Sequence, residues 1–258
     1  MKKRTKKPKI AIISLTSCEG CQFAMIDLGQ KFLDLLKKVD LDEFRLFKDG
    51  RSSSNHYDIC FVEGNPITLE NITLLKEMRQ KSDFLVVLGN CAALGGIWEM
   101  KNYKSKQEIV KKIYKTKKVA NPDIKEVDNF VEVDFTIPGC PIDGGEFLEV
   151  VGQMLLGKKP KIDQSPVCYE CQTKGYDCLL QSGEICLGPI TLGGCQAVCL
   201  KSKQSCWGCR GLFEGAQVRN FMEYLLKNFT RDDVYRVLEV FGARDSVLGE
   251  LSNKENKK

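Results

Sequence analysis

Cysteine is the residue that most constrains what this chain can fold into. The sequence holds 13 cysteines among 258 residues, and eight of them lie within one stretch, CYECQTKGYDCLLQSGEICLGPITLGGCQAVCLKSKQSCWGC, at 168–209. This stretch is rich in Gly, Gln and Ser, and no hydrophobic periodicity lasts for more than a few positions. Such a segment cannot build an ordinary hydrophobic core, so bound metal or cross-links must organise it.

The N-terminus indicates the compartment in which these thiols are kept. The basic start MKKRTKKPK is not followed by the apolar region of a signal peptide, because IAIISL is too short and is more typical of a strand. No apolar run approaches the ~18 residues of a membrane span. We therefore expect a cytoplasmic protein, in which cysteines are more often metal ligands or redox centres than disulfides.

Strand and helix patterns alternate over the first 160 residues. Short apolar runs with β-branched residues are typical of buried parallel strands, and they predict strands at Lys9–Leu15, Glu43–Phe47, Tyr57–Gly64, Asp83–Asn90 and Val131–Gly139. Apolar residues at helical spacing predict helices, the second with Thr68 as its N-cap, at 22–39, 66–81, 109–118 and 145–157. Strands separated by helices imply parallel β-α-β units, so we expect an α/β fold with a flavodoxin-like, doubly wound parallel sheet of about five strands.

Composition divides the chain into four expected parts. These are a basic tail at 1–9, the flavodoxin-like domain at 10–160, a Cys-rich extension at 161–211, and amphipathic helices with a polar tail at 212–258. Six Lys or Arg lie in the first nine residues. A basic tail is usually a solvated arm, and no aromatic residues are interleaved with these charges, so the sequence does not predict nucleic-acid binding.

Four upstream cysteines follow three of the predicted strands. Cys18 and Cys21 come just after the first strand, Cys91 after the fourth and Cys140 after the fifth. Because ligands of an open parallel sheet bind outside the carboxyl ends of its strands, these four thiols can converge although up to 122 positions separate them. Four convergent thiolates suit a 4Fe-4S cluster, and neighbouring Gly and Pro residues allow the tight turns that it needs. A helix starting after Cys21 would favour an anionic cluster.

Other interpretations of these cysteines stay open. CEGC after a strand is also the pattern of a thioredoxin-like dithiol, but that would leave Cys91 and Cys140 unexplained at the same edge. A structural zinc ion also takes four thiolates. Cys60 differs from the rest, because it lies inside the apolar run DICFVEG and is expected to be a small buried core residue.

The spacing within the dense segment favours two sites of four cysteines. Zinc ribbons use two compact Cys-x2-Cys pairs per site, whereas each half of this segment has only one such pair, at its outer end. Iron–sulfur ligation tolerates irregular spacing because the chain wraps around a large cluster. Filling the sites in chain order gives one set of Cys168, Cys171, Cys178 and Cys186 and another of Cys195, Cys199, Cys206 and Cys209.

The cysteine motifs together resemble the small, electron-transferring subunit of nickel–iron hydrogenases. The resemblance rests on six motifs in order, TSCEGCQ, GNCAALGG, PGCP, VCYECQ, CLGPITLGGC and CWGCRG, and covers roughly residues 10–211. Within that family the chain is most similar to the cytoplasmic, multi-subunit branch, with the sulfhydrogenase delta subunit and its F420-linked or viologen-reducing relatives. The resemblance implies an oxidoreductase acting on hydrogen, with a C-terminal Cys-rich iron–sulfur extension on the flavodoxin-like domain.

The resemblance also implies a role for each cysteine set. Three 4Fe-4S clusters are expected: a proximal one on Cys18, Cys21, Cys91 and Cys140, a medial one on the Cys195 set and a distal one on the Cys168 set. The proximal cluster would lie nearest the nickel–iron site of a large subunit. A further iron–sulfur or flavin subunit would complete the heteromeric complex.

Departures from related subunits identify the subtype. Membrane-bound and periplasmic relatives carry His as the first distal ligand and a twin-arginine signal, whereas this chain has Cys168 and no such signal. The related quinone-reductase subunit has adjacent cysteines at its first motif, where this chain has CEGC. Four medial cysteines suit a four-iron cluster rather than a three-iron one. The expected subtype is therefore the cytoplasmic one, with no membrane span.

Residues for hydrogen chemistry itself are missing from the sequence. The only His, His56, lies in the polar loop SSSNHYD and is expected to be exposed, and no paired Cys-x2-Cys motifs near both termini could hold nickel and iron. We therefore expect no catalytic residue in this chain and no activity without a large subunit. The alternative function is a zinc-stabilised interaction protein on a flavodoxin-like fold.

Overall fold

The computed structural model describes residues 6–47, 49–50, 52–114 and 122–253. The chain forms two compact units, Met1–Ala93 with Lys125–Ile162 and Leu94–Ile124 with Asp163–Lys258. The first unit contains the sheet, and the second contains the Cys-rich segment. Because these units are defined by packing alone, the expected boundaries of the Cys-rich domain, after residue 160 and at residue 211, remain predictions. The ends of the basic and polar tails, residues 1–5 and 254–258, lie outside the described residues.

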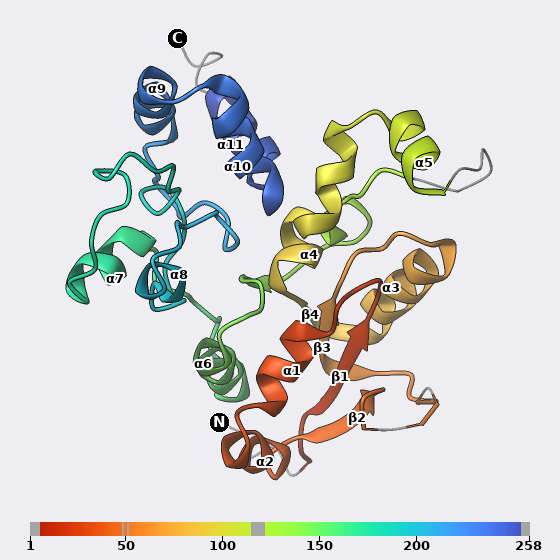
Figure 1. Ribbon diagram of the computed structural model, residues 1–258. Coiled ribbons are helices and arrows are strands. Elements are labelled where there is room, and N and C mark those ends of the chain that lie inside the picture. Colours follow the sequence, from red (N-terminus) through yellow and green to blue (C-terminus); the bar gives the residue numbers. More distant parts are fainter. Residues whose placement is uncertain (1–5, 48, 51, 115–121, 254–258) are drawn as a thin grey trace. The chain divides into compact units, whose positions relative to one another are not determined.

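A five-stranded parallel sheet forms the centre of the first unit (Figure 1). Its spatial order is β2-β1-β3-β4-β5, and every neighbouring pair is parallel. This is the flavodoxin-like strand order, in which the chain winds first to one side of β1 and then to the other. The predicted fold class is confirmed. The strands are Lys9–Ser14 (β1), Asp40–Phe44 (β2), Tyr57–Glu63 (β3), Ser82–Leu88 (β4) and Phe135–Ile137 (β5).

Helices cover both faces of this sheet. Ile10 and Ile12 point into one hydrophobic cluster and Ala11 and Ile13 into another, because successive side chains of a strand face opposite sides. Figure 1 shows α3 and α6 on opposite sides of the strands. The first cluster is completed by α1 (Gly20–Ile26), α2 (Gln30–Leu36) and α6 (Gly144–Leu155), and the second by α3 (Leu69–Lys81).

Several element limits differ from the sequence-based expectation. The single helix expected at 22–39 is two helices, because Gly29 adopts a left-handed φ of 55° between α1 and α2. The strand expected at 43–47 ends at Phe44, and β5 has only three residues. The helix expected at 109–118 is α5 (Lys106–Tyr114), and the rest of that range lies outside the described residues. The Thr68 cap is confirmed, since its hydroxyl accepts the Asn71 N–H at 3.2 Å.

The second unit combines the Cys-rich segment with helices from two parts of the chain. Its hydrophobic core includes Leu187 and Ile190 of the Cys-rich segment together with Leu225, Leu238 and Val247 of the C-terminal helices. Residues 94–124 join this unit through a 3-10 helix, η1, that packs against α10. A second 3-10 helix, η2 (Val127–Asn129), belongs to the first unit. The elements of the second unit are η1 (Gly96–Tyr103), α5, α7 (Val167–Thr173), α8 (Val198–Lys201), α9 (Val218–Asn228), α10 (Arg231–Val240) and α11 (Ala243–Asn253).

Candidate metal centres

The carboxyl ends of four strands meet along one edge of the sheet. Their last residues are in register, with Ser14 opposite Glu63, Glu63 opposite Leu88 and Leu88 opposite Ile137. The segments that follow β1, β4 and β5 carry the four upstream cysteines, here called the sheet set: Cys18, Cys21, Cys91 and Cys140. The structure thus places all four at the edge where the sequence predicts a centre.

Glycines allow the loops that carry these cysteines to approach closely. A Cβ added at Gly89, where φ is 77°, would lie 2.4 Å from Cys21 Sγ and 3.2 Å from the carbonyl oxygen of Gly139. A Cβ added at Gly20 would lie 3.3 Å from Cys18 Sγ. The Cys21 thiol therefore occupies space that a side chain at Gly89 would fill, and the Cys18 thiol would be in tight contact with a side chain at Gly20.

The local structure around the sheet set differs from the expected loops in two places. Cys21 belongs to the first turn of α1, which begins at Gly20, so the helix does not start after Cys21. Glu19 precedes this helix with a left-handed φ of 62°. Cys91 lies within the short helix α4 (Gly89–Leu94) rather than in an irregular loop.

Glu63 is a buried acid at this edge that sequence reasoning missed. Only 2% of Glu63 is exposed, and its carboxylate accepts the N–H of Cys21 at 3.1 Å and the N–H of Gln22 at 3.3 Å. The Gln22 side-chain amide donates to the same group at 2.9 Å. These bonds fix the start of α1 against the end of β3. A signal was present in the sequence, since an acid ending the apolar run YDICFVE needs a partner.

The four thiols of the sheet set influence each other electrostatically. Burial raises the pKa of the Cys21 thiol far above its ordinary value, and Glu63, Cys140 and Cys91 raise it further. Burial also raises the pKa of Cys140, with smaller contributions from Cys18 and Glu63. Thiols in such surroundings stay protonated unless a cation compensates the thiolate charge, and thiolates bind metal only after losing their protons. The donor set is therefore suited to a metal centre.

The Cys168 set gathers around α7 in the second unit. Cys168 and Cys171 lie within this helix, and Cys178 and Cys186 follow it. Burial raises the pKa of Cys168 to about 12, and Cys186, Cys171 and Cys178 add to that increase. Burial raises the pKa of Cys171 as well, followed by the effects of Cys186 and Cys178. These influences show that the four thiols are near one another, and their grouping as one ligand set remains a prediction.

The Cys195 set surrounds α8. Cys199 lies in this helix, Cys195 precedes it, and Cys206 and Cys209 follow it. Burial raises the pKa of Cys195, the N–H of Ala197 lowers it, and Cys199 is among the smaller influences that raise it. Burial also raises the pKa of Cys206, with Cys186 and Cys209 adding to the effect. Cys199 thus lies near Cys195, and Cys209 lies near Cys206.

Hydrogen bonds join the two sets of the second unit at Cys186 and Cys206. The Cys206 N–H donates to Cys186 Sγ at 3.4 Å, and the Leu187 N–H donates to the Cys206 carbonyl at 2.8 Å. The two sets are therefore neighbours. Since Cys186 and Cys206 come from different predicted sets, the division of the eight cysteines remains a prediction.

A zinc ion and a 4Fe-4S cluster need their thiolates at different positions. Among the residues that the structure describes, no three His, Cys, Asp or Glu side chains are arranged to hold a single metal ion. A zinc ion needs its thiolate sulfurs about 2.3 Å from one point. A 4Fe-4S cluster binds each thiolate through a separate iron and so accepts sulfurs that lie further apart. Each of the three cysteine sets has the four thiols that a 4Fe-4S cluster takes.

Cys60 takes no part in these sets. It lies in β3, is completely buried, and belongs to the hydrophobic cluster under α3. Burial raises its pKa to about 12. The prediction that Cys60 is a core residue is confirmed.

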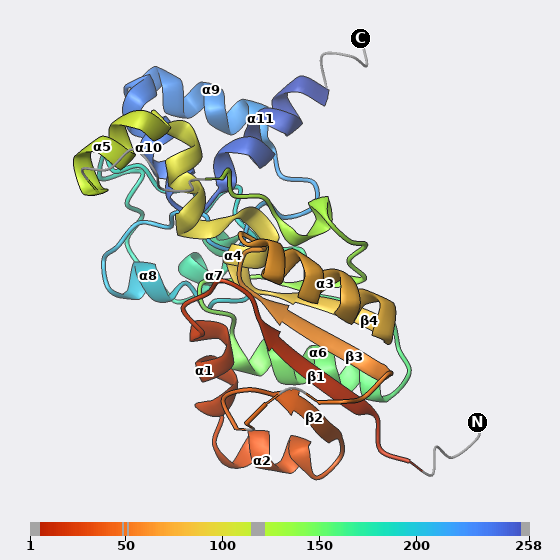
Figure 2. The same cartoon turned by 90° about the vertical axis from the view of Figure 1, so that its right-hand side faces the viewer.

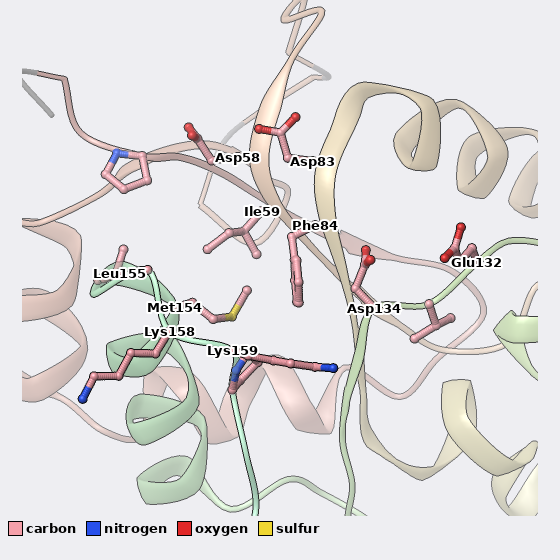
Figure 3. Close-up of a pocket in the computed structure, with 14 residues that line it drawn as sticks. Asp58, Ile59, Asp83, Phe84, Glu132, Asp134, Met154, Leu155, Lys158 and Lys159 are labelled. Carbon is pink, nitrogen blue, oxygen red and sulfur yellow. The ribbon is translucent and has the colours of Figure 1, made fainter. Parts of the chain in front are cut away.

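A pocket of about 560 Å³ opens at the opposite edge of the sheet, near the amino ends of β3 and β4 (Figure 3). Ile59, Phe84 and Met154 line it with apolar surface, as Figure 3 shows. Asp83 at its rim pairs with His56, whose Nε2 lies 3.0 Å from Asp83 Oδ1. The side chain of His56 is 60% exposed, which confirms its expected exposure. This pocket lies at the end of the sheet away from the cysteines.

The sequence of this chain is similar to those of known proteins. The family model of the NADH ubiquinone oxidoreductase 20 Kd subunit matches residues 18–154, which include all four cysteines of the sheet set. The sulfhydrogenase 2 subunit delta of Pyrococcus furiosus is 33% identical over 90% of this chain and 98% of its own length. The chain belongs to the family of the NADH ubiquinone oxidoreductase 20 Kd subunit, and within it the chain is a hydrogenase small subunit.

A second relative extends the similarity beyond the sheet. A subunit of the F420-non-reducing hydrogenase of Methanocaldococcus jannaschii is 29% identical over 79% of this chain and 81% of its own length. The family model ends before the Cys-rich segment. Relatives that match most of the chain include that segment. The family model therefore spans β2 to β5, and these hydrogenase subunits match more of the chain.

A solved structure supports the fold. A NAD+-reducing [NiFe]-hydrogenase in the H2-reduced state contains a chain that superposes with a TM-score of 0.55 and 24% identity. It covers 61% of this chain and 96% of that chain. In the described part of this hydrogenase small subunit, no helix has the length and apolar character needed to cross a membrane.

Proposed function

We propose that this hydrogenase small subunit transfers electrons through three 4Fe-4S clusters held by 12 of its cysteines. The convergence of the sheet set carries this proposal. Four thiols from three separate segments meet at one sheet edge, and no disulfide or core packing would require that arrangement. Each cluster, when bound, would supply a one-electron carrier.

The sheet set is proposed to hold the proximal cluster. Cys18 is exposed and Cys21 is buried, so one side of this centre opens to solvent while the other is enclosed by the sheet edge. The buried carboxylate of Glu63 orients Cys21 through its backbone N–H. An open side at this edge is where a large subunit carrying a nickel–iron site would have to bring its metal close.

The second unit is proposed to hold the two other clusters. The Cys168 set would bind the distal cluster and the Cys195 set the medial one, within a Cys-rich domain at 161–211. Burial of Cys186 and Cys206, each 6% exposed, protects the contact between the two sets from water. Cys178 and Cys199 are both exposed, so the choice of the Cys168 set as the distal centre, which would pass electrons to a further iron–sulfur or flavin subunit, rests on the resemblance to related subunits.

The subunit is proposed to work in a cytoplasmic, heteromeric nickel–iron hydrogenase. The names of the relatives support this, since they are subunits of a sulfhydrogenase and of an F420-non-reducing hydrogenase. The pure chain should show no hydrogen-dependent dye reduction, and activity should appear only with a large subunit. Hydrogen oxidation by the isolated chain would contradict this division of labour.

Metal analysis tests the proposal directly. Protein purified without oxygen should carry about 12 iron and 12 sulfide per chain, given four of each per 4Fe-4S cluster. Zinc in place of iron would instead favour a zinc-stabilised interaction protein. Only four iron in intact protein would contradict the three-cluster proposal.

A further inference from the structure

Glu170 connects the two cysteine sets of the second unit. It lies on α7 between Cys168 and Cys171, yet its carboxylate contacts the segment that carries Cys195. Oε1 accepts the N–H of Gly194 at 2.7 Å, and Oε2 accepts the N–H of Ala197 at 3.1 Å. Both views of the fold show α7 and α8 side by side (Figures 1 and 2). A side chain of α7 thus accepts hydrogen bonds from residues on both sides of Cys195, the first cysteine of the Cys195 set.

The segment that Glu170 holds has an unfavourable backbone conformation. Gln196 and Ala197 both adopt left-handed φ values, 58° and 51°, a conformation that is unfavourable for residues other than glycine. Gly193 also packs tightly, since an added Cβ would lie 3.0 Å from the Ser165 carbonyl oxygen and 3.5 Å from Glu170 Cδ. The turn therefore needs bonds from outside itself, and Glu170 supplies two of them.

The same carboxylate places a negative charge beside a candidate ligand. Glu170 Oε2 lies 3.8 Å from Cys195 Sγ. The same segment also contacts a cation, since Arg210 is only 3% exposed and its Nε donates to the Gly193 carbonyl at 2.7 Å. Charges at such distances interact more strongly in a partly buried site than in water. A negative charge near a cluster stabilises its oxidised, less negative state and so lowers its reduction potential.

We propose that Glu170 is a positioning residue for the centre built on Cys195, and that its charge lowers the reduction potential of the cluster at that centre. The proposal rests on the proposed function for the presence of the cluster. The positioning of the Gly193–Ala197 segment is independent of it, because both hydrogen bonds involve only this chain.

The test compares three variants of the full chain in its complex. Glu170→Gln removes the charge and keeps one acceptor, while its amide nitrogen cannot accept the second N–H. Glu170→Asp keeps the charge. Glu184→Gln is the matched control, since Glu184 also lies within two residues of a candidate ligand but is exposed, and its carboxylate accepts from Ser205 Oγ at 3.2 Å.

Hydrogen exchange and redox titration give separate results. In Glu170→Gln the amides of Gly194 and Ala197 should exchange about tenfold faster or more, because a hydrogen bond to a charged group is lost. The midpoint reduction potentials of the three clusters are followed by EPR. The potential of one cluster, the one at the Cys195 centre, should rise while the other two stay unchanged. Glu170→Asp should keep all three potentials near those of the parent, and Glu184→Gln should change neither result.

Two results would overturn the proposal. One is Glu170→Gln protein with full iron content and three unmoved potentials, whatever its exchange rates. The other is the same set of changes in Glu184→Gln, which would make them a general effect of charge loss. Failure of the proposed function would give a different result, because the unmodified protein itself would then lack iron. The exchange experiment would still report on the positioning of Gly194 and Ala197.

Discussion

The Cys21 thiol occupies the space where a side chain at Gly89 would be. A Cβ built at Gly89 would lie 2.4 Å from Cys21 Sγ, although the two residues belong to segments after different strands. This contact exists because β1 and β4 end at the same sheet edge. Glycine at position 89 is therefore needed both for the close approach and for its left-handed φ of 77°.

Gly89→Ala should disrupt the sheet set. The added methyl group forces Cys21 Sγ to move and places alanine in a left-handed conformation, which costs roughly 1–2 kcal/mol by itself. We expect purified protein to lose about four iron per chain, the content of one 4Fe-4S cluster. Iron analysis of Gly152→Ala provides the control, since a Cβ at Gly152 meets nothing within 4 Å. Full iron content in Gly89→Ala would show that the Cys21 thiol is free to shift.

Glu63→Gln tests the buried acid that orients Cys21. Glutamine can accept only through one oxygen, so at least one of the bonds from the Cys21 and Gln22 N–H groups is lost. Loss of a buried bond to a charged group costs about 1.5–3 kcal/mol. The expected result is a lower free energy of unfolding by that amount in urea titrations. Glu77→Gln serves as the control, because Glu77 is exposed on α3 and pairs with Lys81 at 2.7 Å. Equal stability of both variants would count against the role assigned to Glu63.

Cys60→Ala should leave iron content unchanged and alter the response to alkaline pH. Burial raises the pKa of Cys60 from near 9 to about 12, so above pH 9 the unfolded chain loses a proton that the folded chain keeps. The free energy of unfolding of metal-free protein should therefore fall as pH rises through this window, by about 1.4 kcal/mol per pH unit from this thiol alone. The variant should lack that part of the slope. Loss of four iron in Cys60→Ala would instead make Cys60 a ligand.

Much of the fold could be predicted from the sequence, because apolar runs and turn residues determine it locally. Thr68 and the strand at Tyr57–Glu63 are examples in which local pattern and tertiary structure agree. The break at Gly29 was missed because the apolar positions on either side keep helical spacing. The short β5 was predicted too long, since an extended segment outside the ladder has the same residue pattern as a strand.

Only part of the candidate site could be predicted from the sequence. The position of Cys18, Cys91 and Cys140 at one edge follows from parallel topology alone, so sequence spacing was sufficient. The bonds of Glu63 and Glu170 join residues 42 and 24 positions apart, and no local pattern encodes which backbone N–H a carboxylate will reach. The membership of residues 94–124 in the second unit likewise depends on the packing of η1 against α10.

Cys168→Ser tests the order of the three proposed clusters. If the Cys168 set is distal, the change affects only the exit of electrons, because the sheet set and the Cys195 set keep all their ligands. Hydrogen-dependent reduction of the physiological acceptor by the complex should fall at least tenfold. Hydrogen–deuterium exchange at the nickel–iron site of the large subunit needs no net electron flow and should persist. Cys168→His should be milder, since imidazole also binds iron, although replacing a thiolate raises the potential of the cluster. A correctly assembled Cys168→Ser complex that reduces its acceptor at the full rate would show that the Cys168 set is not the exit.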